Sequence, residues 1–282
     1  MGTNKSNDIL TSIHGKRVGL NAEGQLVVNS KLVTAKVDGL WDFAPGRGSP
    51  FEFYELFDDF MNPASSTASD AQAWTATNDG GTGTPVFNVD AVGGIANVLT
   101  AAADNDYAAY ASASEVFKFA AGKRLWFEAR VKVAEATTNE STWWVGLTDT
   151  LTTGGMQANT AGPLASYDGA LIYKTPETAL TLNFESSNAG TQVTNSAEVT
   201  SVTNTWNRVG FFFDGGNSSS ATTGTITPFY AVNDSNTFVK GTAQTITLSG
   251  LEEMHAVFGI KAGPTAAAET LQIDYIKVVA ER

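Results

Sequence analysis

The sequence predicts an all-β protein, with a sandwich over residues 51–282 and an extended N-terminal arm over residues 1–50. Short apolar stretches bounded by Gly, Asn and Asp recur from Phe51 onward, and none of them sustains the helical period. This pattern is typical of a β-sandwich. The arm carries apolar clusters that are too few to build a core of their own, so we expect them to be buried against another surface.

The clearest strand pattern lies in residues 125–133, where two sets of side chains alternate. Such alternation predicts a strand with one buried face and one wet face. The residues assigned to the buried face are Leu125, Phe127, Ala129, Val131 and Val133, and those assigned to the wet face are Glu128, Arg130 and Lys132. Further strands are expected at residues 143–147, 170–173, 180–184, 206–213, 225–232, 254–260 and 271–279.

Three connecting segments stand out. Residues 17–20 and 24–28 of the arm flank a turn and predict a small hairpin. Residues 42–50 contain two prolines and two glycines and are expected to link the arm to the sandwich. The Thr-, Gly- and Asn-rich connection over residues 151–169 has two readings, a functional loop or a flexible excursion over one sheet.

Composition limits the partners. The net charge is −12, yet the first 50 residues hold six Lys/Arg against four Asp/Glu, so residues 51–282 carry −14. An acidic body disfavours nucleic acid and anionic membranes as partners. The chain has no cysteine, no N-terminal secretory signal and no apolar run long enough to span a membrane. We therefore expect synthesis in a cytoplasm, without export by the general secretory route.

The sequence offers no catalytic constellation, and we expect no enzyme. Glycoside hydrolysis needs a pair of carboxylates, but Glu128 and Glu185 stand alone on different expected strands. A serine triad or a zinc site needs histidine, and the two histidines, His14 and His255, are far apart in sequence. No catalytic residue is assigned.

Two kinds of binding residue are candidates. Asp58, Asp59, Asp104 and Asp106 offer oxygen ligands for Ca²⁺, although such residues are also ordinary turn formers. No other metal or cofactor is expected. In the pair Trp143–Trp144, neighbouring side chains point to opposite faces of a strand. One indole is then expected in the core and the other at the surface, under a loop or at an interface, which makes this pair the best candidate for contact with a glycan.

Two terminal segments resemble a known fold. The sequence Phe57-Asp58-Asp59-Phe60, followed by Trp74, and the sequence from Leu271 to Val278 resemble the first and last strands of concanavalin-A-like jelly rolls of the legume-lectin or laminin-G type. This resemblance covers residues 51–282. It implies a jelly-roll sandwich in which the first and last strands pair side by side.

A second resemblance concerns the arm. Residues 4–20 resemble the N-terminal stretch of structural proteins from tailed-bacteriophage virions. It implies a capsid decoration or cement protein on the outer surface of the virion, bound to the major capsid protein and to itself as a homodimer or homotrimer. The arm residues expected to contact the capsid are Ile9, Leu10, Ile13, Arg17, Val18, Leu20, Leu26, Val27, Val28, Leu32 and Val33. The alternative is a lectin-like adhesion module that binds carbohydrate through Trp143 or Trp144 on the virion.

Overall fold

The fold is all-β. A computed structural model describes residues 11–13, 16–20, 26–28, 31–32, 40, 52–60, 74–78, 85–88, 94–150, 162–176, 180–265 and 267–282. These residues form strands, turns and irregular segments without a helix, which confirms the predicted fold class. No helix in the described part of the chain could therefore serve as a membrane span.

The first large sheet has nine strands, and every pair in it is antiparallel. Seven strands lie in a continuous order: β17 (Val239–Lys240), β16 (Thr223–Ala231), β15 (Asn207–Asp214), β10 (Arg124–Ala134), β20 (Thr270–Glu281), β8 (Ile95–Leu99) and β7 (Pro85–Asn88). Two more join beside this path, β18 (Gln244–Thr247) on β16 and β5 (Phe53–Asp58) on β20.

The second large sheet has seven antiparallel strands. Their order is β14 (Thr191–Thr200), β13 (Thr181–Asn188), β12 (Gly169–Lys174), β11 (Thr142–Thr148), β19 (His255–Lys261), β9 (Tyr107–Ser112) and β6 (Trp74–Asn78). Neighbouring strands come from distant parts of the chain, since β19 lies between β11 and β9.

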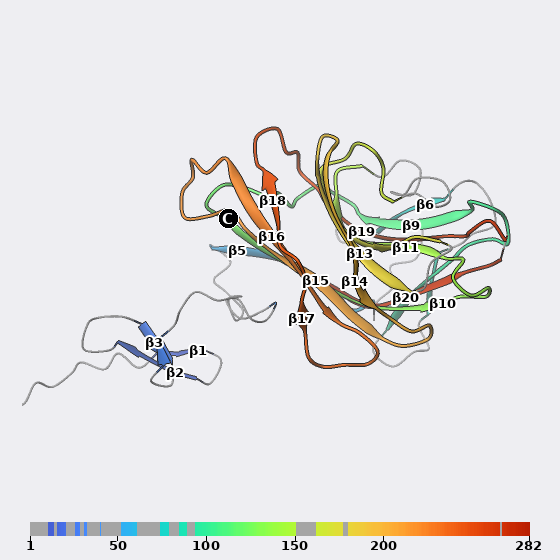
Figure 1. Ribbon diagram of the computed structural model, residues 1–282, viewed down its shortest axis with the longest axis horizontal. Coiled ribbons are helices and arrows are strands. Elements are labelled where there is room, and N and C mark those ends of the chain that lie inside the picture. Colours follow the sequence, from blue (N-terminus) through green and yellow to red (C-terminus); the bar gives the residue numbers. More distant parts are fainter. Residues whose placement is uncertain are drawn as a thin grey trace, which may run out of the picture.

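The first and last strands of the sandwich pair as the jelly-roll resemblance implies. Phe57 on β5 lies opposite Lys277 on β20, and Phe53 lies opposite Glu281. The C-terminal end of the chain consequently lies beside β5 (Figure 1). The two ends of the sandwich thus lie next to each other in the nine-stranded sheet.

The arm forms a small antiparallel sheet of four strands: β1 (Thr11–Ile13), β2 (Lys16–Leu20), β3 (Leu26–Val28) and β4 (Lys31–Leu32). Val18 lies opposite Val28 in the β2–β3 pair, which confirms the predicted hairpin. The structure describes only the backbone pairing of these residues. The division of the chain at residue 50 stays a prediction.

The core lies between the two large sheets. Phe127 and Phe211 stack on neighbouring strands of the nine-stranded sheet with ring centroids 5.0 Å apart. Phe184 of the seven-stranded sheet approaches Phe211 at 6.0 Å. The inward residues of β10 are Leu125, Phe127, Ala129, Val131 and Val133, at most 3% exposed, so the predicted buried face is confirmed.

The outer face of the nine-stranded sheet is only partly wet. Arg130 and Lys132 are partly exposed there, as predicted. Glu128 is 4% exposed, so its predicted place in water is wrong. Arg208 Nε donates to Glu128 Oε1 at 2.8 Å, and the Tyr275 hydroxyl donates to the same oxygen at 2.5 Å. These neighbours cover the carboxylate and supply the hydrogen bonds that burial requires.

A second apolar cluster lies on this outer face. It joins Trp126, Phe212, Phe229 and Val279 from four strands, and Leu40 from the N-terminal side of the sandwich packs into it. Each of these side chains is at most 5% exposed. Leu40 thus packs with the sandwich, although the sequence places it inside the arm.

Candidate functional site

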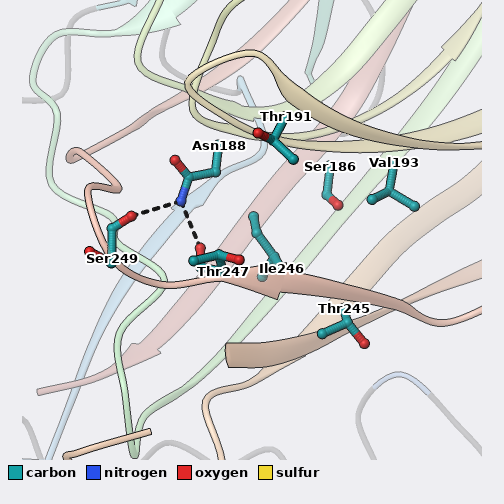
Figure 2. Close-up of a pocket in the computed structure, with 8 residues that line it drawn as sticks. All are labelled: Ser186, Asn188, Thr191, Val193, Thr245, Ile246, Thr247 and Ser249. Atoms are coloured by element: carbon teal, nitrogen blue, oxygen red, sulfur yellow. Dashed lines mark hydrogen bonds between the residues drawn. The ribbon is translucent and has the colours of Figure 1, made fainter. Parts of the chain in front are cut away.

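A groove lies at one edge of the sandwich, between the β13–β14 pair of one sheet and β18 of the other (Figure 2). Its volume is about 180 Å³. The described residues that line it are Ser186, Asn188, Thr191, Val193, Thr245, Ile246, Thr247 and Ser249. All of them are uncharged, and most carry a hydroxyl or an amide. Such a lining suits a neutral ligand with several hydroxyl groups better than an ion.

Strand register explains how these residues meet. Ser186 follows Phe184 by two positions on β13, so both side chains point toward the space between the sheets. Phe184 fills the core, whereas Ser186 reaches the edge, where the core ends. From the other sheet, Ile246 is 4% exposed and Thr245 and Thr247 are exposed. The groove therefore has a buried floor and an open, hydroxyl-bearing rim.

The floor of the groove holds an unsatisfied polar group. Ser186 is 1% exposed, and its Oγ has no hydrogen-bond partner in the described part of the chain. A buried hydroxyl without a partner costs about 1–3 kcal/mol, so such groups in native proteins are uncommon. Ile246 lies on the opposite side of the groove and offers an apolar contact (Figure 2). A ligand that hydrogen-bonds Ser186 Oγ would recover this cost.

A buried glutamate lies on the other side of β13, on the outer face of the seven-stranded sheet. Glu185 Oε1 accepts from the Tyr167 hydroxyl at 3.2 Å and from Gln192 Nε2 at 2.9 Å, and Oε2 accepts from Thr194 Oγ1 at 2.5 Å. Burial raises the pKa of Glu185, and the hydrogen bonds from Thr194 and Tyr167 partly oppose this shift. The hydrogen bond from Tyr167 thus joins the segment before β12 to Glu185 on the sheet.

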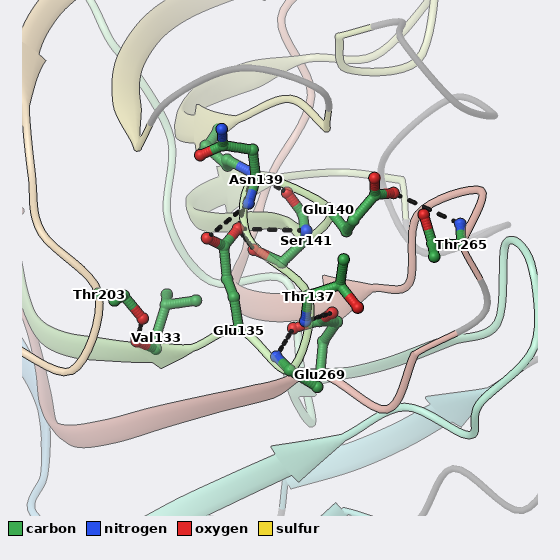
Figure 3. Close-up of polar contacts among 11 residues, drawn as sticks. Val133, Glu135, Thr137, Asn139, Glu140, Ser141, Thr203, Thr265 and Glu269 are labelled. Carbon is green, nitrogen blue, oxygen red and sulfur yellow. Dashed lines mark hydrogen bonds and ion pairs between the residues drawn. The ribbon is translucent and has the colours of Figure 1, made fainter.

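The end of the sandwich near β10 and β11 holds a polar network (Figure 3). Glu135 Oε1 accepts from Ser141 Oγ at 2.6 Å and from Lys174 Nζ at 2.8 Å, and Oε2 accepts from the Asn139 amide at 3.1 Å. Burial lowers the pKa of Lys174, while the hydrogen bond and charge of Glu135 raise it. Glu269 accepts from the Ala136 amide at 2.9 Å. These contacts fix the connecting loops and leave Lys174 fully buried, at 0% exposure.

Both tryptophans of the predicted glycan contact are buried at 1% exposure, so that expectation is corrected. Trp143 faces the core between the sheets. Trp144 faces the outer side of β11, where Tyr167 and Tyr173 pack around it. The indole also lies against Gly259, where an added Cβ would collide with it. Neither ring offers a face to solvent, because Tyr167 and side chains of the neighbouring strands cover the indole of Trp144.

The structure does not assemble the four calcium candidates. Asp58 accepts from the Phe60 amide and from Trp74 Nε1, both at 2.7 Å, so it joins β5 to β6. Asp106 accepts from the Ala101 amide and is buried, and Asp104 accepts from the neighbouring Asn105. Among the described residues, which include Asp59, no group of three or more His, Cys, Asp or Glu side chains could hold a metal ion.

The arm candidates are only partly within the described residues. Ile9, Leu10 and Val33 lie outside them. The other eight lie in β1–β4, for which the structure describes backbone pairing: Ile13, Arg17, Val18, Leu20, Leu26, Val27, Val28 and Leu32. Their predicted contact with a capsid stays a prediction.

The two carboxylates considered for hydrolysis, Glu128 and Glu185, lie in different sheets and form no common site. Glu128 belongs to β10 of the nine-stranded sheet and Glu185 to β13 of the seven-stranded sheet, each on an outer face. His255 contacts the Ser112 carbonyl through Nδ1 at 2.6 Å and Glu115 through Nε2 at 3.2 Å. His14 lies outside the described residues.

Sequence reasoning missed the groove. Its two walls are separated by about fifty residues, and no motif joins them. Two sequence features could have pointed to it: the alternating threonines at 245 and 247, and the hydroxyl- and amide-bearing residues within the separate stretch 186–191. That pattern shows which side chains face outward but not that two sheet edges meet there.

Solved structures share this fold. Peanut lectin in complex with a 9mer peptide superposes with a TM-score of 0.53 at 14% identity, over 81% of this chain and 97% of that one. Basic winged bean lectin with Tn-antigen gives 0.51 at 11% identity, over 81% and 98%. A protein of unknown function from Shewanella oneidensis MR-1 gives 0.52 at 14% identity, over 84% and 96%. No protein-family model and no curated protein matches the chain.

These likenesses define the class. The protein has a legume-lectin-like, concanavalin-A-like jelly-roll fold, as the resemblance of its terminal strands implied. At such low identities the likeness concerns the fold, and function has to be argued from the site. Nothing in the comparisons indicates a bacteriophage virion protein.

Proposed function

We propose that this protein is a carbohydrate-binding, lectin-like module rather than an enzyme, and that it binds neutral saccharide in the edge groove. The fold is shared with peanut lectin and winged bean lectin, the second of which was solved with Tn-antigen. The observation that carries the proposal is the groove itself, which joins an uncharged hydroxyl-rich lining to Ser186 Oγ, a buried hydroxyl with no partner among the described residues.

The chemistry of the groove fits a sugar. A pyranose presents hydroxyl groups around its ring and C–H groups on its faces, so it needs both polar and apolar contacts. Ser186 and Thr245 supply hydroxyls, and Ile246 and Val193 supply aliphatic surface. The lining residues are uncharged, which gives no preference to acidic sugars or phosphates.

Calorimetric titration with neutral saccharides chosen from a glycan array tests the proposal. We expect Ser186→Ala and Thr245→Val each to weaken binding about 2–10-fold, the equivalent of one neutral hydrogen bond. Ser219→Ala, on an exposed loop and not among the described residues that line the groove, is the matched control and should bind as the wild type does. An array without signal, both with and without Ca²⁺, would sink the proposal.

Ser186→Ala has a second expected effect. Because no described residue hydrogen-bonds this buried hydroxyl, its removal should leave the free energy of unfolding unchanged or raise it, while ligand binding weakens. A loss of stability together with a loss of binding would point to a structural role for Ser186.

Attachment to a capsid stays a prediction from the arm sequence, tested by pull-down of the full chain with purified phage heads.

A further inference from the structure

The edge groove is bounded at one end by Asn188. Its Nδ2 donates to the Thr247 carbonyl at 2.8 Å and to the Ser249 carbonyl at 3.0 Å (Figure 2). Asn188 belongs to the seven-stranded sheet, and the two carbonyls belong to β18 and the residues after it. This side chain therefore bridges the two sheet edges and blocks the groove in the strand direction.

The opposite end is bounded in the same way. Asn195 Nδ2 donates to the Thr242 carbonyl at 2.7 Å, and the Thr242 amide donates to Glu198 Oε2 at 2.9 Å. Gln244 Nε2 also donates to the Phe184 carbonyl at 3.2 Å. Polar side chains thus join the two sheet edges on both sides of Ser186.

The distance between these bridges limits the length of a ligand. Phe184 lies opposite Asn195 in the β13–β14 register, and Asn188 lies opposite Thr191. Phe184 and Asn188 are four positions apart on β13, which is about 13 Å at roughly 3.3 Å per residue. Bridging side chains occupy part of that length, so the open stretch beside Ser186 is shorter.

The volume gives the same limit. The groove holds about 180 Å³, below the roughly 300–1,000 Å³ of pockets that enclose drug-sized ligands. One sugar ring with its hydroxyl groups suits this space. A chain that continued in both directions would run into Asn188 at one end and Asn195 at the other.

We propose that the groove binds one neutral pyranose, either free or at the end of a glycan, and excludes the interior units of a polysaccharide. This inference rests on the proposed function and specifies its ligand. The C–H face of the ring lies against Ile246 and Val193, and Ser186 Oγ receives or donates the buried hydrogen bond. The rest of the glycan leaves through the open rim formed by Thr191 and Thr245.

The test compares ligand lengths. Glucose, galactose and mannose are titrated into the full chain, each with its linear oligomers of two to six units. For the sugar that binds, only the terminal unit of an oligomer should occupy the groove. We therefore expect the dissociation constant to stay within about threefold from the disaccharide to the hexasaccharide. A dissociation constant that falls steadily with every added unit would overturn this inference and leave carbohydrate binding intact. Absence of binding by every sugar would overturn the proposed function as well.

Two variants separate the bridges from the fold. Asn188→Ala opens one end of the groove and Asn195→Ala the other, and each should let affinity rise with oligomer length beyond the disaccharide. Asn217→Ala, on an exposed loop, is the matched control and should keep the wild-type length dependence. Far-ultraviolet circular dichroism and the unfolding midpoint verify that each variant is folded. If both folded variants keep the wild-type length dependence, the bridges do not set the ligand length and the inference is wrong.

Discussion

Leu40 occupies space that a side chain at Gly210 would fill. A Cβ added to Gly210 would come within 2.6 Å of Leu40 Cδ2 and would also collide with the Phe127 carbonyl oxygen of the neighbouring strand. The absence of a side chain on β15 therefore lets Leu40 pack against Trp126 and the other residues of the outer-face cluster. A residue from the N-terminal side of the linker is thus part of the sandwich.

Leu40→Ala should destabilise the sandwich. The side chain is 1% exposed, and truncation of a buried leucine costs about 2–5 kcal/mol. Chemical denaturation, followed by tryptophan fluorescence, measures the loss. Val239→Ala is the control, because Val239 is 60% exposed and its truncation should change stability by less than about 0.5 kcal/mol. Equal effects of the two changes would mean that Leu40 does not support the sandwich.

The inner face of β10 was predictable from sequence because it depends on a local pattern. The pairing of β5 with β20 joins distant parts of the chain, and it was expected only because the two terminal segments resemble concanavalin-A-like jelly rolls. Alternation over residues 125–133 assigns the core face whatever the neighbours are. The sequence left open whether the outward indole of the Trp143–Trp144 pair lies under a loop or at an interface. It could not show that Tyr167 covers Trp144, since this contact depends on how the chain returns across the sheet. The groove was hidden for the same reason, because Ser186 and Thr245 come from different sheets.

Trp144→Ala should act on stability and not on sugar affinity. The indole is buried against Gly259 and between tyrosines, so its removal leaves a large cavity and costs about 3–5 kcal/mol. Thermal unfolding measures this loss, and titration of the folded variant with saccharide should give the wild-type dissociation constant. Selective loss of affinity without loss of stability would restore Trp144 as a glycan contact.

Lys174→Met should be costly, because it leaves Glu135 buried without its cation. The two side chains are 0% and 3% exposed, and breaking such a buried pair costs about 3–5 kcal/mol. Lys118→Met is the matched control, since the Lys118–Glu253 pair is 41% and 57% exposed and water screens it, so its loss should change stability much less. Denaturant titration compares the two, and similar losses would contradict a special role for the buried pair.

Glu185 should make stability depend on pH in an acid range. Burial raises its pKa, so the folded protein takes up this proton more readily than the unfolded chain does. The free energy of unfolding of the wild type, relative to Glu185→Gln, should therefore increase as the pH falls from neutral through the raised pKa. It should level off below the pKa of the unfolded chain. A relative stability that instead increases with pH would contradict the assigned direction.

Two N-terminal deletions test where the arm ends. Deletion of residues 1–39 keeps Leu40 beside Gly210, whereas deletion of residues 1–41 removes it. The first should unfold like the full chain, within about 0.5 kcal/mol, because the cluster stays complete. The second should lose about 2–5 kcal/mol, as Leu40→Ala does. Equal losses in the two deletions would mean that residues before Leu40 also stabilise the sandwich, and the boundary between arm and sandwich would then lie before residue 40.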